Sequence, residues 1–196
     1  MPPTLENRQN FALWSQSQTC FKNAVEGIEY IVDNDLQQTD FLYGPLSTWT
    51  IIQYAKPFTN NRGFERLDKK IVPEAYQDCH EFVIESRNKI AAHMDGDASS
   101  LLGSEARKKL HRVNIAITED NKIVTLAKEL KIGTQVIHEF HALAKKMLDK
   151  AVTNSRIYAE KVYDKLRQKR LRPGEYEISL DPKAKNWFRQ LPRHEK

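Results

Sequence analysis

The chain has 196 residues, of which 40% are hydrophobic and 29% charged, a composition that fits one folded domain and excludes a disordered chain. Its net charge of +5 permits a nucleic-acid partner without requiring one. Because the chain has only two cysteines, no apolar run of the ~18 residues that a membrane span needs, and no basic-then-apolar start, we expect a cytoplasmic protein rather than a membrane or secreted one.

Two helical patterns occupy the first third of the chain. Apolar residues recur at three- and four-residue steps over residues 10–33, which predicts an amphipathic helix that the turn-forming run DND ends at 33–35. The stretch GPLSTWTIIQYAKPF predicts a second helix over residues 44–57, because proline suits its first turn and a second proline, Pro57, closes it. A loop rich in asparagine and glycine follows at 58–64.

A third helix is predicted over residues 73–93. Pro73 and Glu74 suit its first turn, and Asp95-Gly96 is a strong stop signal. Its apolar face consists of Tyr76, Cys79, Phe82, Val83, Ile90 and Ala91. Across the three helices we expect core positions, rather than base-stacking positions, for Trp14, Tyr30, Trp49 and Phe82.

The pattern changes after the third helix. The alternation in HRVNIAIT and the following EDNK turn predict a β-hairpin at about 111–128. A long helical stripe then runs over 133–168, and EYEISL predicts a short strand at 175–180. The sequence therefore predicts a mainly α fold, with one helical domain over residues 1–172, a small hairpin before a long last helix, and a basic C-terminal tail over 173–196.

The stretch ESRNKIAAH carries the main candidate site, Arg87, Asn88 and His93. The bare spacing has little specificity, since an arginine followed five to seven positions later by a histidine recurs at Arg189 and His194. The structural interpretation is a solvated arginine and a histidine at a helix C-terminus, where the helix dipole favours its cation by about 0.3–1 kcal/mol.

The same stretch resembles the signature of the HEPN superfamily, in which a polar residue, often asparagine, follows an arginine and a histidine lies four to six residues further on. The segment YAKPFTNNRG, residues 54–63, is similar to one that recurs in bacterial HEPN-like proteins one helix upstream of that signature. The resemblance covers about residues 10–95. It implies a HEPN-like bundle of four to five helices and an endoribonuclease site, free of metal and cofactor, at a homodimer interface.

The chemistry of such a site follows from its residue types. RNA supplies its own nucleophile, the 2′-hydroxyl, so cleavage needs a base, an acid and positive charge at the phosphorus. His93 can act as base or acid, Arg87 can hold the phosphate with two hydrogen bonds, and Asn88 can orient either one. On an ideal helix Arg87 and His93 lie about 120° apart, so the pair of one chain would not converge neatly. Two chains packed through residues 73–93, with a contribution from 10–33, could bring both pairs to one cleft, and the resemblance implies such a symmetric dimer.

One position departs from the family pattern. In HEPN toxins that a nucleotidyltransferase antitoxin silences, a tyrosine stands two residues after the histidine, whereas this chain has Asp95 there. Adenylylation is therefore not supported, and Asp95 would add negative charge beside the phosphate. The resemblance implies phage defence or a toxin–antitoxin system as the setting, with an antitoxin or regulatory protein as partner. A non-catalytic HEPN-like RNA- or protein-binding dimerisation module stays open as the alternative, as does a plain structural dimer.

Other residues are candidates for binding roles. The stretch KVYDKLRQKRLR has six basic residues and one acid, which fits either an RNA-backbone contact or a solvated helix end. The candidate RNA-binding residues are Lys56, Lys161, Lys165, Arg167, Lys169, Arg170 and Arg172. The histidines of HEFH, residues 138–141, lack the zinc-protease spacing, so we expect a structural role and no metal. Cys79 shares the apolar face, so we expect a buried thiol rather than a reactive pair with His80.

Overall fold

A computed structural model describes residues 3–59, 65–94, 114–117, 123–126, 132, 134–167, 176–181, 183–184 and 187–191. Their α-helices are α1 (Leu5–Asp33), α2 (Tyr43–Ala55), α3 (Gln77–Met94) and α5 (Thr134–Arg167), joined by the short 3₁₀ helices η1 (Lys56–Phe58), η2 (Lys69–Ile71) and η3 (Glu74–Tyr76). The mainly α fold class is confirmed. Within these residues every helix is too short or too polar to cross a lipid bilayer.

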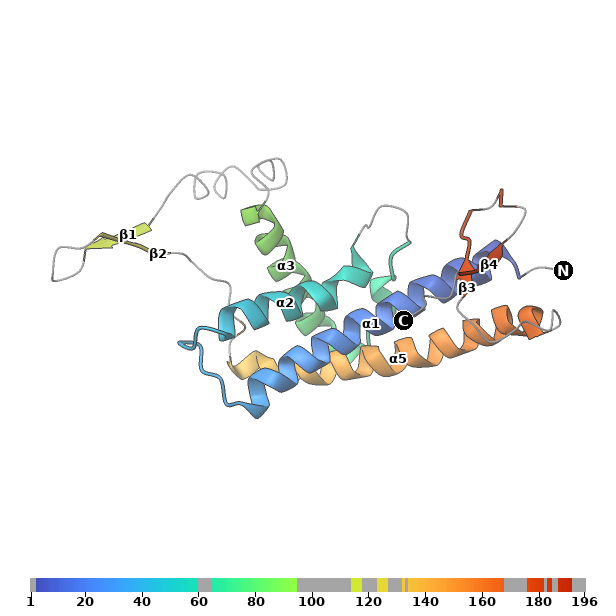
Figure 1. The fold of residues 1–196 in the computed structure, drawn as a ribbon. Helices are drawn as coiled ribbons and strands as arrows, with labels where there is room; N and C mark the ends of the chain where they lie inside the picture. The colour runs from blue at the N-terminus through green and yellow to red at the C-terminus, as the bar shows by residue number, and fades with distance from the viewer. Residues whose placement is uncertain are drawn as a thin grey trace.

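Helices α1 and α5 form an antiparallel pair along the length of the molecule (Figure 1). Glu29 near the end of α1 meets His141 near the start of α5, and the hydroxyls of Ser15 and Ser155 meet at 3.0 Å toward the other end. The pair buries Phe21, Ala24 and Ile28 of α1 with Phe140, Leu143, Ala144 and Met147 of α5. Full burial of a large apolar side chain stabilises a fold by about 1.5–3 kcal/mol, so this seam holds the two helices together.

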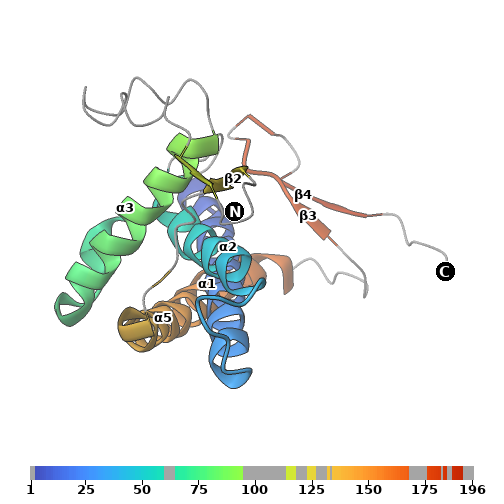
Figure 2. The ribbon, with the colours of Figure 1, turned by 90° about the vertical axis from the view of Figure 1, so that its left-hand side faces the viewer.

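Helix α2 packs closely on α1 because Gly27 has no side chain. A Cβ at Gly27 would lie 2.5 Å from the Thr50 hydroxyl and 2.9 Å from the Trp49 ring. The other face of α2 contributes Tyr43, whose buried hydroxyl donates to the Ile132 carbonyl at 2.6 Å. In the nearly end-on view of Figure 2, α2 lies over the α1–α5 pair and α3 is set to one side.

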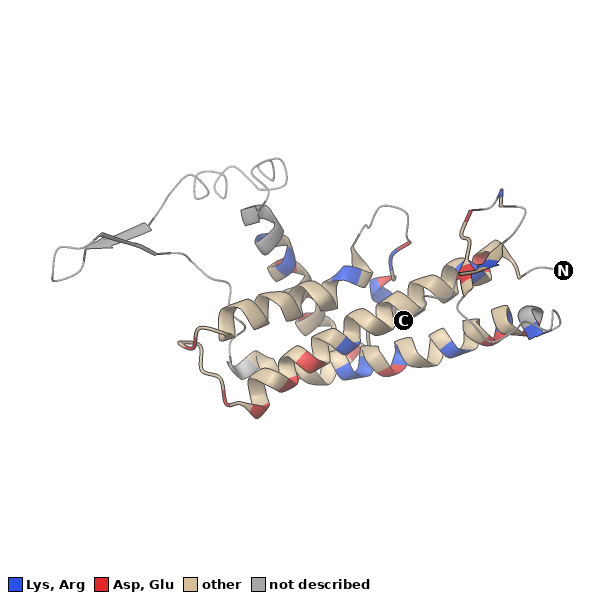
Figure 3. Cartoon of the chain, in the orientation of Figure 1, with Lys and Arg blue, Asp and Glu red and all other residues tan. Residues whose placement is uncertain are grey.

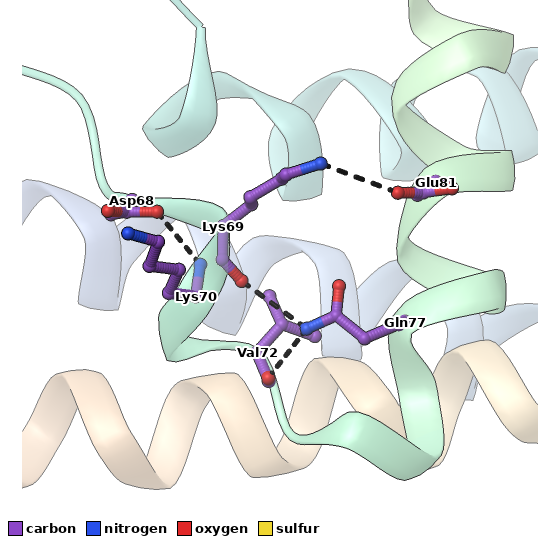
Figure 4. A network of polar contacts seen from close by, with 6 residues as sticks. All are labelled: Asp68, Lys69, Lys70, Val72, Gln77 and Glu81. Carbon is purple, nitrogen blue, oxygen red and sulfur yellow. Dashed lines mark hydrogen bonds and ion pairs between the residues drawn. The ribbon is translucent and has the colours of Figure 1, made fainter.

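The segment before α3 is fixed by polar contacts (Figure 4). The Asp68 carboxylate accepts from the Lys70 backbone amide at 2.9 Å, and the Lys69 ammonium lies 3.6 Å from Glu81. The Gln77 side chain donates to the Val72 carbonyl at 2.8 Å. These contacts set where α3 begins, because they tie η2 to the first turns of that helix.

Two antiparallel hairpins complete the described residues. The first, β1 (Asn114–Ile117) with β2 (Ile123–Leu126), falls inside the predicted hairpin and confirms it. The second pairs β3 (Tyr176–Ile178) with β4 (Phe188–Gln190). The sequence predicted β3 and missed β4. Trp187, just before β4, is buried with Val162 of α5 and Phe11 of α1, and the Arg8 guanidinium donates to the Ser179 carbonyl.

The predicted core is correct for one of the four aromatic residues singled out. Trp14 is buried, whereas the expectation is wrong for Tyr30, Trp49 and Phe82, which are 48%, 40% and 41% exposed. Helical spacing predicts which residues share one face of a helix. It does not predict how wide a strip of the helix the neighbouring elements cover. Helix α3 is covered along the strip of Val83, and the adjacent Phe82 falls outside it. Trp49 lies over Gly27 at the edge of the α1–α2 contact.

Candidate functional site

Helix α3 has a buried inner strip that ends at the candidate site. Its buried side chains are Cys79, His80, Val83 and Ser86. Seven residues separate His80 from Arg87, which is almost two full helical turns, so both lie on the same side of α3. Arg87 is half-buried and Asn88 is exposed. The candidate site therefore begins where the strip emerges from the core.

His80 is held inside an aromatic cluster. Its Nδ1 lies 2.9 Å from the Tyr54 hydroxyl, and its ring meets the Phe58 ring edge-on at 4.6 Å between centroids. Burial lowers the pKa of His80 and raises that of Tyr54, so a neutral imidazole and a protonated phenol share this hydrogen bond. The sequence prediction missed this pair. The available signal was the spacing of His80 with Tyr76, Cys79 and Val83 at helical steps.

Cys79 is the buried thiol that the sequence predicted. It is 4% exposed, and burial raises its pKa to about 12, with a further contribution from the charge of Glu139. A thiol with so high a pKa stays protonated at neutral pH and is a poor nucleophile. Cys79 therefore belongs to the core, and the pairing of His80 with Tyr54 gives that histidine a structural role.

Arg87 is free of carboxylates among the described side chains. Its Nη1 donates to the Asn88 side-chain oxygen at 3.3 Å, while the nearby Glu85 pairs with Lys89 at 2.9 Å. An ion pair between Arg87 and Glu85 would have neutralised the guanidinium. Among the described side chains, the polar neighbour of the guanidinium is instead the neutral Asn88.

His93 lies in α3, near the C-terminal end that the sequence predicted. Its side chain and Asp95 are outside what the structure describes. The convergence of Arg87 with His93 and the homodimer therefore remain predictions.

The basic stretch at the end of α5 lies away from Arg87. Figure 1 shows α3 and the C-terminal end of α5 at different positions along the molecule, and Figure 3 shows both charge signs along α5. Lys161 is exposed, with its ammonium 4.5 Å from the centre of the Tyr158 ring, and the exposed Arg167 lies 3.7 Å from Asp164. The side chain of Lys165, and all of Lys169, Arg170 and Arg172, are outside the described residues.

Lys56 occupies the junction of α2 and η1. It is exposed and lines a small cavity with Cys20 and Glu65. Burial raises the pKa of the Cys20 thiol, and the positive charge of Lys56 opposes this shift. Lys56 therefore stands at the surface, as an RNA contact requires, but beside α1 rather than beside Arg87.

One of the two histidines of HEFH, His141, has a structural partner. The His141 Nε2 lies 3.2 Å from the Glu29 carboxylate, which also pairs with Lys145 at 2.9 Å, and His138 is exposed. The hydrogen bond from Lys145, followed by that from His141, lowers the pKa of Glu29. The described residues contain no group of three or more side chains suited to a metal ion. The contacts of Glu29 with His141 and Lys145 join α1 to α5.

Comparisons of the chain with protein-family models, with curated proteins and with solved structures returned no match.

Proposed function

We propose that the protein is a metal-independent endoribonuclease of the HEPN type, with Arg87, Asn88 and His93 acting at a homodimer interface. The proposal extends to a role in phage defence or a toxin–antitoxin system, as the resemblance implies. The observation that carries it is the state of Arg87. Its guanidinium is half-buried, touches Asn88, and has no carboxylate partner among the described side chains.

Each residue has a chemical role in the proposed reaction. One His93 removes the proton of the 2′-hydroxyl, whose oxygen then attacks the adjacent phosphorus. The bond from phosphorus to the 5′-oxygen breaks, and a protonated histidine, supplied by the partner chain, protonates the leaving oxygen. Arg87 stabilises the negative charge on the phosphoryl oxygens, and Asn88 orients the Arg87 guanidinium. The products are a 2′,3′-cyclic phosphate and a 5′-hydroxyl.

The proposal also gives an RNA-binding role to seven basic residues outside the candidate site. Lys56, Lys161, Lys165, Arg167, Lys169, Arg170 and Arg172 would contact the RNA backbone at a distance from the cleaved bond. Such contacts raise affinity without reading sequence, and they weaken as salt concentration rises. The alternative, a non-catalytic RNA- or protein-binding dimerisation module, would use the same surfaces without cleavage. The exposed Phe82 on α3 favours it, because solvent-exposed aromatic side chains are common in protein interfaces.

The test is cleavage of total and transfer RNA in EDTA by purified wild type, His93→Ala and Arg87→Ala. Lys146→Ala is the control, since Lys146 is an exposed lysine of α5 that belongs to neither the candidate site nor the candidate RNA-binding residues. Cleavage by wild type and the control, with cyclic-phosphate ends and none from the other variants, supports the nuclease. RNA binding without cleavage by any of the four proteins supports the alternative.

A further inference from the structure

The helices α1 and α2 expose a group of large apolar side chains at one end of the molecule. Phe41 is 89% exposed, and Leu42 and Trp49 are 45% and 40% exposed. Tyr30 of α1 and Pro45 of α2 are also exposed. We refer to these five residues, Tyr30, Phe41, Leu42, Pro45 and Trp49, as the α1–α2 apolar face.

The pairing of the two helices brings four of these residues to one side, and Phe41 lies in the turn directly before Leu42. Asn23 meets Gln53 at 3.4 Å, and Gly27 lies under Trp49, so α1 and α2 run antiparallel in a fixed register. One turn further along α1 comes Tyr30, and one turn back along α2 comes Pro45. Leu42 precedes Trp49 by seven residues, which is about two helical turns, and therefore falls on the same side of α2.

The charge around the face is negative. Residues 23–55 contain five acidic residues and no lysine or arginine, although the whole chain has a net charge of +5. Two of the five, Glu26 and Glu29, pair with Lys22 and Lys145, so the negative charge is that of three aspartates. Asp33, Asp35 and Asp40 lie in or beside the turn between α1 and α2, where Figure 3 shows acidic residues. Asp35 and Asp40 accept hydrogen bonds from Gln37, which leaves their charge in place, and none of the three is in an ion pair with a described side chain.

We propose that the α1–α2 apolar face binds a basic amphipathic segment of a partner protein. Its apolar side chains would cover Phe41, Leu42 and Trp49, and its lysines or arginines would lie beside Asp33, Asp35 and Asp40. Exposed aromatic residues at the centre of a patch provide most of the affinity in protein interfaces, and a charged rim of opposite sign orients the partner. This site is independent of RNA cleavage at Arg87.

The negative charge beside the α1–α2 apolar face favours a basic segment over two other candidate partners, nucleic acid and a second copy of this chain. Nucleic acid is excluded because its phosphates would meet the aspartates of the rim without a cation between them. A second copy related by a two-fold axis would present the same face, and would therefore bring acidic residues of both chains together. A basic segment is the occupant whose charge compensates that of the rim.

The experiment uses a labelled amphipathic peptide of leucine and lysine, about four helical turns long, with fluorescence anisotropy as the readout. A matched peptide with glutamate at every lysine position is the first control. We expect the lysine peptide to bind the wild type and the glutamate peptide not to bind. Binding of the lysine peptide should weaken roughly tenfold or more in Phe41→Ser/Trp49→Ser, because these residues are the apolar anchors.

Two further variants test the surface itself. Val152→Ser/Ile157→Ser removes two similarly exposed apolar side chains from α5 and should leave the affinity unchanged. Asp33→Asn/Asp35→Asn/Asp40→Asn keeps side-chain oxygens for the turn and should reduce both the affinity and its dependence on salt. Circular dichroism of each variant checks the fold, and the high exposure of Phe41 makes its replacement harmless to folding.

Three results would overturn the proposal. The lysine peptide could fail to bind the wild type, or bind the Phe41→Ser/Trp49→Ser variant equally well. Alternatively, sedimentation could show a wild-type dimer that Phe41→Ser converts to a monomer, which would assign the face to a second copy. Each result leaves the RNA-cleavage assay with His93→Ala unaffected, so failure of this proposal and failure of the nuclease are distinguishable.

Discussion

The two halves of α3 differ in the surroundings of their polar side chains: His80 in the first half is buried, whereas Arg87 in the second half is only half-buried. In the inner half, His80 is 3% exposed and bound to Tyr54 within a ring of aromatic side chains. In the outer half, Arg87 is half-buried and touches only the exposed Asn88 among the described polar side chains. Both halves present polar groups on the same side of the helix. The surroundings of a polar side chain, rather than its residue type, therefore distinguish a structural group from a candidate reactive one.

The largest expected effect is on RNA cleavage in the outer half. Arg87→Ala and His93→Ala should each lower the cleavage rate roughly 10²- to 10⁴-fold, because positioned proton transfer and charge stabilisation contribute on this scale. Arg87→Ala should change the urea midpoint of unfolding little, since Arg87 makes few described contacts. Rates measured with a labelled RNA in EDTA check the first statement. A loss of stability as large as that of a core variant would contradict the placement of Arg87 outside the core.

In the inner half the expected effect is on stability. His80→Ala should lower the free energy of unfolding by about 2–4 kcal/mol, because it leaves a cavity beside Phe58 and a buried Tyr54 hydroxyl without its partner. Urea unfolding followed by circular dichroism gives this value. Lys89→Ala, on the exposed side of the same helix, should stay within about 0.5 kcal/mol of the wild type. Equal effects of the two variants would contradict the sealed environment of His80.

Two neighbouring residues provide a sharper test of how the helix is covered. Val83→Ala should destabilise the protein by about 2 kcal/mol, because Val83 is fully buried. Phe82→Ala removes a larger side chain but should cost less than about 1 kcal/mol, since Phe82 is 41% exposed. Urea unfolding of both variants is sufficient. The reverse order would place Phe82 in an interface formed by this protein in solution.

The smallest expected effect is the dependence of stability on pH. Burial lowers the pKa of His80 in the folded state, so the unfolded chain binds the proton more readily. The stability that the neutral histidine provides is therefore complete above its ordinary pKa of about 6.5 and decreases as the pH falls through and below that value. Urea midpoints at pH 7.5 and 5.5 should differ more in the wild type than in His80→Gln. Equal differences would show that His80 does not contribute.

Much of the helical fold followed from periodicity. Three-, four- and seven-residue steps place α1, α3 and α5 close to their observed bounds, and the alternation of HRVNIAIT places the first hairpin. The start of α1 was missed by several residues, because the polar turn LENRQN shows no apolar period but is capped by the Thr4 side chain. Strand β4 was missed because three residues carry too little pattern, and its position depends on the burial of Trp187 against Val162 and Phe11.

For the candidate site, too, some features follow from the local sequence and others depend on packing between elements. Helical periodicity was enough to predict that Arg87, Asn88 and His93 share one helix and that Cys79 faces the core, because a helix fixes the relative directions of nearby side chains. The pair of Glu85 with Lys89, four residues apart in α3, is equally local. Packing between elements instead sets the burial of His80 against Tyr54 and the exposure of Trp49, Tyr30 and Phe82. These outcomes depend on which neighbouring element covers each strip of a helix, and that coverage is set by contacts between residues far apart in the chain.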